Sequence, residues 1–254
     1  MSEIEATGLL ARMRRGERLA GTFMKTPSHV QLEILMLAGL DFVCLDAEHA
    51  PFGRRDLDAC LAIGRALDFP LLVRIPAGTP EAILQALDSG AVGIVVPHVD
   101  GPAKAEAVAR AARFGAGGRG YAGSTRWAGF ATRAMPDVLA QGEETIVIAQ
   151  IEEPAGVDTV DAIAATPGID ALFVGPADLA VGYGCAMDDA RIDDAYAAVA
   201  RACEASGTAM WTWVANEGGA RARAAQGVTG FLTGSEHAWM LAGARAAAEA
   251  VRGA

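Results

Sequence analysis

Short apolar segments alternate with longer amphipathic segments along this chain. Eight of the apolar segments are rich in Val, Ile, Leu and Phe and lack the polar alternation of half-exposed strands. Uninterrupted runs of this kind are typical of parallel strands that are covered on both faces. The predicted strands are Gly21–Met24, Phe42–Asp46, Leu71–Ile75, Gly93–Pro97, Thr145–Ile151, Ala171–Val174, Thr208–Val214 and Gly230–Thr233.

A segment with helical periodicity follows each predicted strand, and Gly or Pro marks several of the boundaries. The predicted helices are Ser28–Leu37, Asp56–Leu67, Pro80–Leu87, Ala103–Arg113, Gly156–Ala165, Asp189–Glu204, Glu217–Gln226 and Glu236–Val251. Eight strand–helix units in 254 residues predict one domain, residues 1–254, folded as a closed (β/α)₈ barrel. An open doubly wound sheet is disfavoured, because no Gly-rich phosphate-binding loop follows the first strand.

One connection, residues 115–144, is much longer than the others. Loops of this length in a compact domain are often functional or partly structured. It contains Arg119, Ser124, Arg126 and Trp127. We expect this loop to cover the mouth of the barrel.

Composition narrows the range of partners. The net charge of -10 argues against nucleic acid or an anionic membrane surface as the main partner. The four cysteines form no C-x-x-C pair, the first residues lack the features of a signal peptide, and no apolar stretch is long enough to span a bilayer. We therefore expect a cytoplasmic protein that acts on small molecules.

Polar side chains collect where the predicted strands end. Chemistry in β/α barrels takes place at the C-terminal ends of the strands, so these residues are the candidates for a functional site. They are Asp46, Glu48, His49, Arg74, His98, Gln150, Glu152, Glu153 and Asp178.

Glu152 and Asp178 end adjacent strands at the same predicted height. Two carboxylates, completed by water and substrate oxygens, suit a hard octahedral cation such as Mg²⁺ or Mn²⁺. The alternative is that both are exposed carboxylates at the rim, with Asp178 capping a helix after Pro176. The pattern favours metal binding.

Arg74 and His49 are the candidates for acid–base and charge-stabilising roles. The planar guanidinium of Arg74 suits a carboxylate or a developing enolate oxygen, although a structural ion pair with Asp46 is also compatible with its position. His49 can act as a general acid or base with Asp88 as its carboxylate partner, or it can be a solvent-facing loop histidine. For His98, between Pro97 and Val99, a structural role is favoured.

The chain has only two lysines, Lys25 and Lys104. A Schiff-base aldolase needs a desolvated lysine inside the barrel. Lys104 falls on a predicted helix and Lys25 in a polar turn after the first strand. A metal-dependent mechanism is therefore preferred over an imine mechanism.

Five motifs together resemble the class II 2-keto-acid aldolases, a family that includes 4-hydroxy-2-oxoheptanedioate aldolase and 2-dehydro-3-deoxyglucarate aldolase. The similarity extends over nearly the whole chain, with the motifs in the order and approximate spacing of the family. The motifs are Asp46–Pro51, Val73–Pro76, Leu87–Ala91, Gln150–Glu152 and Gly175–Leu179.

The resemblance implies a metal-dependent retro-aldol cleavage of a 4-hydroxy-2-oxo acid to pyruvate, or hydroxypyruvate, and an aldehyde. It assigns Glu152 and Asp178 to Mg²⁺ or Mn²⁺, with Co²⁺ as a further candidate, and implies no organic cofactor. It assigns enolate stabilisation to Arg74 and proton transfer to His49 with Asp88. The implied substrate contacts are Asp46, Gln150, Gly175, Pro176, Ala177, Ser124 and Val214.

The resemblance also implies a homohexamer, a trimer of dimers, in which the C-terminal helix packs on a neighbouring subunit. Two other functions remain open from the sequence. One is a carbon–carbon lyase of the same barrel type acting on an acyl-CoA ester, which the scarcity of lysine disfavours because the CoA phosphates need basic residues. The other is a binding protein that keeps the barrel as a scaffold without catalysis.

Overall fold

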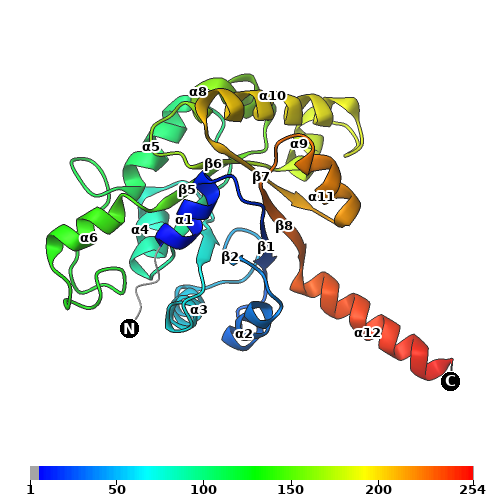
Figure 1. The fold of residues 1–254 in the computed structure, drawn as a ribbon, viewed down its shortest axis with the longest axis horizontal. Helices are drawn as coiled ribbons and strands as arrows, with labels where there is room; N and C mark the ends of the chain where they lie inside the picture. Colours follow the sequence, from blue (N-terminus) through cyan, green and yellow to red (C-terminus); the bar gives the residue numbers. More distant parts are fainter. Residues whose placement is uncertain (1–5, 254) are drawn as a thin grey trace.

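The computed structural model describes residues 6–253, and its centre is a closed barrel of eight parallel strands (Figure 1). The strands pair in chain order, and the last closes against the first. They are β1 (Leu19–Met24), β2 (Phe42–Asp46), β3 (Leu71–Arg74), β4 (Gly93–Val96), β5 (Ile146–Ile151), β6 (Ala171–Val174), β7 (Ala209–Val214) and β8 (Gly230–Ser235). The predicted (β/α)₈ barrel is confirmed.

Helices follow the strands and surround the barrel. Five of them, α2, α4, α10, α11 and α12, start where a Ser, Thr, Asp or Asn side chain accepts a hydrogen bond from the first turn. The helices are α1 (Ala6–Arg14), α2 (His29–Leu37), α3 (Arg54–Ala66), α4 (Pro80–Asp88), α5 (Pro102–Ala112), α6 (Met135–Gly142), α7 (Pro154–Asp158), α8 (Val160–Ala164), α9 (Pro176–Tyr183), α10 (Ala190–Ser206), α11 (Glu217–Ala224) and α12 (Glu236–Arg252).

The sequence analysis did not predict α1, α6 or α9, and it joined α7 and α8 into one helix. The helix α6 lies inside the long connection that was predicted as a loop. The other predicted helices are present with small shifts at their ends.

Two hydrophobic clusters enclose the strands from opposite sides. Alternate strand residues point outward against the helices and form the larger cluster, which includes Val43, Val73, Val174 and Val214. The others point into the barrel and form a second cluster. This inner cluster consists of Leu9, Leu10, Met13, Leu19, Phe23, Phe42, Cys44, Leu72, Val92, Val95, Ile146, Ile148, Ala171, Phe173, Trp211 and Leu232.

The inner cluster seals the barrel at the N-terminal ends of its strands. Three residues of α1 belong to it, so this helix closes that end. Large rings fill the interior because glycines lie opposite them: a Cβ on Gly230 would come within 2.1 Å of the Trp211 ring. The C-terminal ends of the strands form the open mouth.

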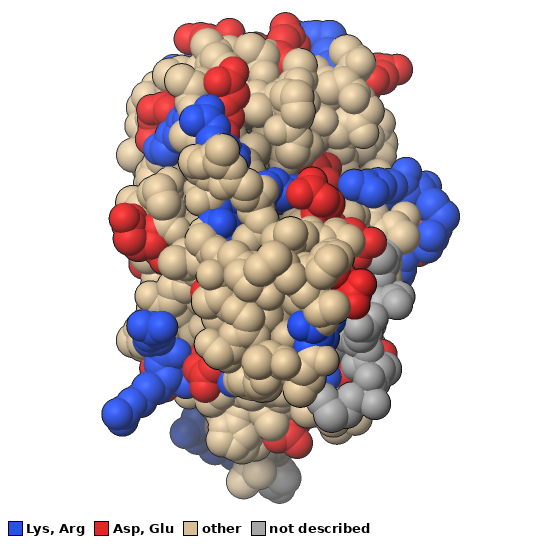
Figure 2. Space-filling model, turned by 90° about the vertical axis from the view of Figure 1, so that its left-hand side faces the viewer, with Lys and Arg blue, Asp and Glu red and all other residues tan. Residues whose placement is uncertain are grey.

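The long connection does not cover this mouth, and that expectation was wrong. It joins α5 to β5 and therefore starts from the closed end of the barrel. Arg126 within it forms an ion pair of 2.6 Å with Asp58 of α3, and the backbone N–H of Trp127 donates to the carbonyl of Asp88 at the end of α4. Figure 2 views the molecule from the side that carries α6, where acidic and basic side chains surround a mostly uncharged centre.

The helix α12 extends away from the barrel (Figure 1). Glu236, its first residue, is the one buried residue along it, while Trp239, Met240 and Leu241 are exposed. Within residues 6–253, no helix combines the length and the apolar character that crossing a membrane requires.

Candidate active site

The side chains inside the barrel change from apolar to polar at its open end. On β2, β3 and β5 the alternation that buries the inner cluster brings Asp46, Arg74 and Gln150 to the last inward positions. Their exposed fractions are 0%, 6% and 1%. Asp46 and Arg74 are also direct register partners on neighbouring strands. Buried polar groups of this kind must pair with each other or with a ligand.

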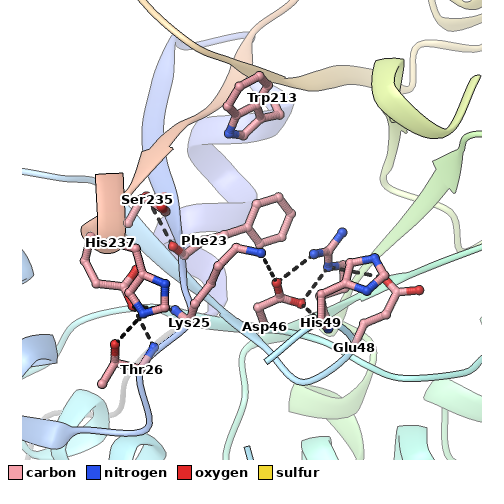
Figure 3. A network of polar contacts seen from close by, with 12 residues as sticks. Phe23, Lys25, Thr26, Asp46, Glu48, His49, Trp213, Ser235 and His237 are labelled. Carbon is pink, nitrogen blue, oxygen red and sulfur yellow. Dashed lines mark hydrogen bonds and ion pairs between the residues drawn. The ribbon is translucent and has the colours of Figure 1, made fainter. Parts of the chain in front are cut away.

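A buried ion-pair network joins three strands at the mouth (Figure 3). Arg74 donates from Nε and Nη2 to the two carboxylate oxygens of Asp46, at 2.9 and 2.7 Å. The ammonium of Lys25, just after β1, lies 3.0 Å from Asp46 Oδ2. The guanidinium of Arg74 also lies 4.2 Å from the centre of the Phe23 ring. The ion pair that the sequence offered as an alternative role for Arg74 is therefore present.

This network determines the protonation of Asp46. Burial alone would raise the pKa of its carboxyl group, but hydrogen bonds from Arg74 and Lys25 outweigh burial and hold the pKa below its ordinary value. Asp46 is therefore a fixed negative charge that orients two cations toward the cavity.

We predict that Asp46→Asn lowers the free energy of unfolding by about 3 kcal/mol at pH 7, because it leaves two partly desolvated cations without their carboxylate. A carboxyl group whose pKa is lowered by folding stabilises the protein above its unfolded pKa of about 4 and loses this contribution as the pH falls toward the folded value. The difference between wild type and variant should therefore shrink below about pH 4.

Urea unfolding between pH 7 and pH 3 measures this difference. Asp58→Asn is the control, since Asp58 is 57% exposed, and it should change the stability by less than about 1 kcal/mol. A difference between Asp46→Asn and wild type that stays constant over this pH range would contradict the charged state of Asp46.

Glu48 and His49 follow β2 and differ in burial. The side chain of Glu48 is 9% exposed and that of His49 is 55% exposed. Glu48 Oε2 lies 3.3 Å from Arg74 Nε and 3.6 Å from His49 Nε2. Burial raises the pKa of Glu48, while the charge of Arg74 opposes the increase. His49 therefore stands at the rim, in contact with solvent and with the buried network.

A second carboxylate centre lies next to this network at Glu152. Its Oε1 accepts a hydrogen bond of 2.7 Å from the backbone N–H of His98, and its Oε2 accepts one from Gln150. Ligand atoms of Glu48, His98 and Glu152 all lie within 4.8 Å of one another. This group has the residue types and spacing of a site for a divalent cation.

A cavity of about 280 Å³ opens between these centres and the start of α9. Its lining includes Arg74, Gln150 and the Gly175–Asp178 segment, with Lys25 and Trp213 among the residues on the other side. Gly175 is in close contact with Glu152, because a Cβ on this glycine would lie 2.8 Å from Glu152 Cβ. The cavity is large enough for a small acid.

Asp178 lines this cavity, but it is exposed and is not part of the group formed by Glu48, His98 and Glu152. It is the third residue of α9. Val214 packs in the outer cluster, so its neighbour Trp213 takes the inward position at the cavity.

Asp88 and Ser124 lie away from the mouth of their own chain. Asp88 ends α4 at the closed end of the barrel, where Arg119 donates to it at 3.1 and 2.5 Å. Ser124 is exposed in the connection that lies at the same end. Among the described residues, no hydrogen bond joins His49 to Asp88, which the sequence analysis paired.

Comparison with known proteins places the whole barrel in one family. The family described as HpcH/HpaI aldolase/citrate lyase matches residues 19–238, from β1 to the start of α12. The chain belongs to this family. It is therefore a carbon–carbon lyase, as the sequence motifs predicted.

Individual HpcH/HpaI family members are similar over most of the chain. A hydroxypyruvate/pyruvate aldolase from Paraburkholderia phytofirmans is 31% identical, covering 96% of this chain and 97% of its own. A 5-keto-4-deoxy-D-glucarate aldolase from Klebsiella pneumoniae is 38% identical over 65% of this chain and 64% of its own. The crystal structure of an HpcH/HpaI aldolase/citrate lyase family protein from Burkholderia cenocepacia superposes with a TM-score of 0.91 at 34% identity, covering 97% of this chain and 99% of that one.

In this HpcH/HpaI family member, three residues at the mouth had been given no catalytic or binding role. The sequence listed Glu48 and His98 among the candidates because they follow strand ends, but it gave Glu48 no role and favoured a structural role for His98. It set Lys25 aside because this residue follows a strand in a polar turn. The structure brings Lys25 to Asp46, and Glu48 and His98 to Glu152.

Proposed function

We propose that this lyase catalyses the reversible retro-aldol cleavage of a 4-hydroxy-2-oxo acid to an aldehyde and pyruvate or hydroxypyruvate, in a metal-dependent reaction through the enolate of the donor acid. The observation that carries this proposal is the buried Asp46–Arg74 pair at a cavity of about 280 Å³, which Arg74 and Asp178 both line. One similar protein is named hydroxypyruvate/pyruvate aldolase and another 5-keto-4-deoxy-D-glucarate aldolase. These names support pyruvate and hydroxypyruvate as the donor acids.

We propose that Glu152 and Asp178 bind Mg²⁺ or Mn²⁺, with Co²⁺ as a further candidate. The residues around Glu152 fit a divalent ion, because the Glu152 carboxylate is buried and ligand atoms of Glu48 and His98 lie within 4.8 Å of it. A bound divalent ion supplies Lewis-acid polarisation of the donor's carbonyl group. Gln150 and the backbone of Gly175, Pro176 and Ala177 at the start of α9 would then orient the donor carboxylate, since the N–H groups of a helix N-terminus favour an anion.

Arg74 would stabilise the negative charge that develops on the donor's 2-oxygen. Its guanidinium is held by Asp46 and by the Phe23 ring, so it needs little reorganisation during the reaction. Asp46 would contribute to substrate binding by fixing this orientation. Trp213, rather than Val214, would form the apolar wall next to the aldehyde.

His49 would transfer the proton of the 4-hydroxyl group, because it is exposed at the rim beside the network. The position of Asp88 at the opposite end of the barrel means that a His49–Asp88 pair needs two copies of the chain. We propose that the partner subunit's Asp88 approaches His49 within a homohexamer. The partner subunit's Ser124 would reach the same site. The unburied apolar residues of α12 are compatible with such an assembly.

The metal requirement tests the proposal. Treatment with a chelator should abolish retro-aldol cleavage, and Mg²⁺ or Mn²⁺ should restore it. Without the ion, the charge of Arg74 alone would have to stabilise the enolate. The measurement is pyruvate release from a panel of 4-hydroxy-2-oxo acids, coupled to lactate dehydrogenase.

Full activity in the chelated protein would contradict the metal mechanism and would favour an imine on Lys25. Borohydride trapping of a substrate adduct would identify that imine, and Lys25→Met would remove it. Release of an acyl-CoA product with no turnover of the keto-acid panel would support the CoA-ester lyase instead.

A further inference from the structure

The long connection between α5 and β5, residues 115–144, lies away from the mouth, yet it holds the carboxylate of Asp88. We infer that this connection positions Asp88 for catalysis in a second copy of the chain, and that Arg119 is the positioning residue. Arg119 would hold one oxygen of Asp88 and leave the other for the partner subunit's His49. The inference rests on the His49–Asp88 pair between subunits that is proposed above, and it adds the residue that orients this pair.

The hydrogen bonds from Arg119 converge on one oxygen of Asp88. Its Nε and Nη2 lie 3.1 and 2.5 Å from Oδ1. Arg74 binds Asp46 differently, because its Nε and Nη2 donate to two different oxygens of that carboxylate. Within residues 6–253, no hydrogen bond reaches Oδ2 of Asp88, and this side chain is 23% exposed. One oxygen of Asp88 is therefore fixed, while the other is available to a further donor.

Arg119 itself has little freedom to move. Its side chain is 0% exposed, and its guanidinium lies 4.7 Å from the ring centres of both Phe114 and Trp127. Contact with aromatic faces attracts a planar guanidinium and restricts its orientation. The backbone of Asp88 is held as well, because the N–H of Trp127 donates to its carbonyl at 3.4 Å. The connection thus fixes Asp88 through both its side chain and its backbone.

The place of Asp88 in its helix is unfavourable for a carboxylate that has no partner. Asp88 is the last residue of α4, where the helix dipole presents partial negative charge. Basic residues stabilise such a helix end, but the last turn of α4 contains none. Arg119 supplies the positive charge from another part of the chain. A carboxylate kept at this place with one oxygen free fits the binding of an outside donor better than the stabilisation of the helix.

A fixed carboxylate determines how well a histidine acts as a base. When it accepts a hydrogen bond from one imidazole nitrogen, it orients the ring and stabilises the cation that forms when the other nitrogen takes a proton. A misplacement of about 1 Å in such a constellation can cost about 100-fold in rate. Arg119 would therefore act on the removal of the 4-hydroxyl proton by the partner subunit's His49, and not on the enolate at Arg74.

Retro-aldol kinetics of Asp88→Asn, Arg119→Gln and the double variant test this role. We expect kcat to fall about 100-fold in Asp88→Asn and about 10-fold in Arg119→Gln, with KM changed less than about 3-fold. The double variant should be no slower than Asp88→Asn, because Arg119 acts through Asp88. Arg119→Lys keeps a positive charge and should recover part of the activity. Arg133→Gln is the matched control and should keep the wild-type kcat, since this arginine of the same connection bonds Gln141 of α6.

Decarboxylation of oxaloacetate separates a positioning role from a purely structural one. The carbon–carbon bond to the departing carboxylate breaks as carbon dioxide leaves, its electron pair forms the enolate of pyruvate, and a proton from water converts this enolate to pyruvate. No 4-hydroxyl proton is removed, so Arg119→Gln should decarboxylate within about 2-fold of the wild-type rate while its aldol cleavage is slow. Normal aldol cleavage in Arg119→Gln, an equal loss in both reactions, or a double variant slowed by the product of the single effects would overturn the inference.

A crystal structure of the assembled protein gives a readout that does not depend on turnover. We expect a nitrogen of the partner subunit's His49 within hydrogen-bond distance of Asp88 Oδ2, with Arg119 on Oδ1, and a displaced Asp88 carboxylate in Arg119→Gln. An Asp88 out of reach of the partner subunit's His49, or a carboxylate that does not move in the variant, would overturn the inference. Failure of the wild type in both reactions would contradict the proposed function instead, and this structural comparison would still decide the role of Arg119.

Discussion

Replacing Glu152 with Gln should reduce kcat/KM for keto-acid cleavage by about 1,000-fold or more. Gln preserves the size of the side chain and an acceptor for the backbone N–H of His98, but it removes the charge that holds the divalent ion. Charge stabilisation by a metal ion is worth several kcal/mol in a transition state, and each 1.36 kcal/mol is a factor of ten in rate. The measurement is steady-state cleavage with saturating Mn²⁺, together with Mn²⁺ binding by calorimetry.

Glu106→Gln, on the exposed face of α5, is the control for this substitution and should retain wild-type kinetics. Glu152 is one of the two proposed metal ligands, so its loss should impair metal binding. A Glu152→Gln variant that binds Mn²⁺ and cleaves the keto acid normally would show that the ion lies elsewhere.

Arg74→Ala should lower kcat by about 100- to 1,000-fold, the range observed when a group that stabilises a developing oxyanion is removed. Metal binding should change much less, because the guanidinium contacts Asp46 and Glu48 but does not belong to the proposed ligand set. The effect should therefore appear in kcat more than in the affinity for Mn²⁺.

Two further variants separate catalysis from folding at this position. Arg74→Lys keeps the charge but loses the two-pronged contact with Asp46, and it should recover only part of the activity. Arg74→Ala leaves the buried carboxylate of Asp46 without its guanidinium partner. The double variant Arg74→Ala/Asp46→Asn removes that carboxylate as well, so it should be more stable than Arg74→Ala but no more active. Near-normal turnover in either alanine variant would remove Arg74 from the reaction.

Much of the barrel follows from where apolar runs begin and end. The strands Phe42–Asp46 and Ala171–Val174 were predicted with their correct ends, because polar residues or glycine interrupt the apolar pattern there. The helix α9 was missed because Pro176 starts it directly after β6, where the sequence reads as a strand end followed by a loop. The helix α6 has only 8 residues, too few for a clear helical period.

The site was predictable where it depends on strand ends and unpredictable where it depends on contacts across the barrel. Asp46 and Arg74 end neighbouring strands, and their pairing follows from the register of β2 and β3. The approach of Lys25 to Asp46 depends on how the turn after β1 folds back, since Glu236 accepts hydrogen bonds from the backbone of Lys25 and Thr26. Nothing near Lys25 in the sequence indicates this contact.

Asp88 shows a different limit of predicting a site from sequence. Its place at the end of a predicted helix already puts it at the opposite end of the barrel from His49, yet the motif around it is one of the five that indicate the family. A sequence motif does not distinguish a contact within one chain from a contact between two chains. A hexamer interface that brings the partner subunit's Asp88 to His49 would reconcile the motif with the topology.

Exchange of the methyl protons of pyruvate in heavy water tests the central claim, that this barrel mouth forms the enolate of a keto acid with the help of a divalent ion. The exchange, followed by proton magnetic resonance, needs no aldehyde and is therefore independent of the acceptor. We predict exchange with Mn²⁺ or Mg²⁺, none after chelation, and strongly slowed exchange in Arg74→Ala. Exchange that continues at the full rate in the chelated protein, or no exchange with any metal while a keto acid is still cleaved, would contradict the account.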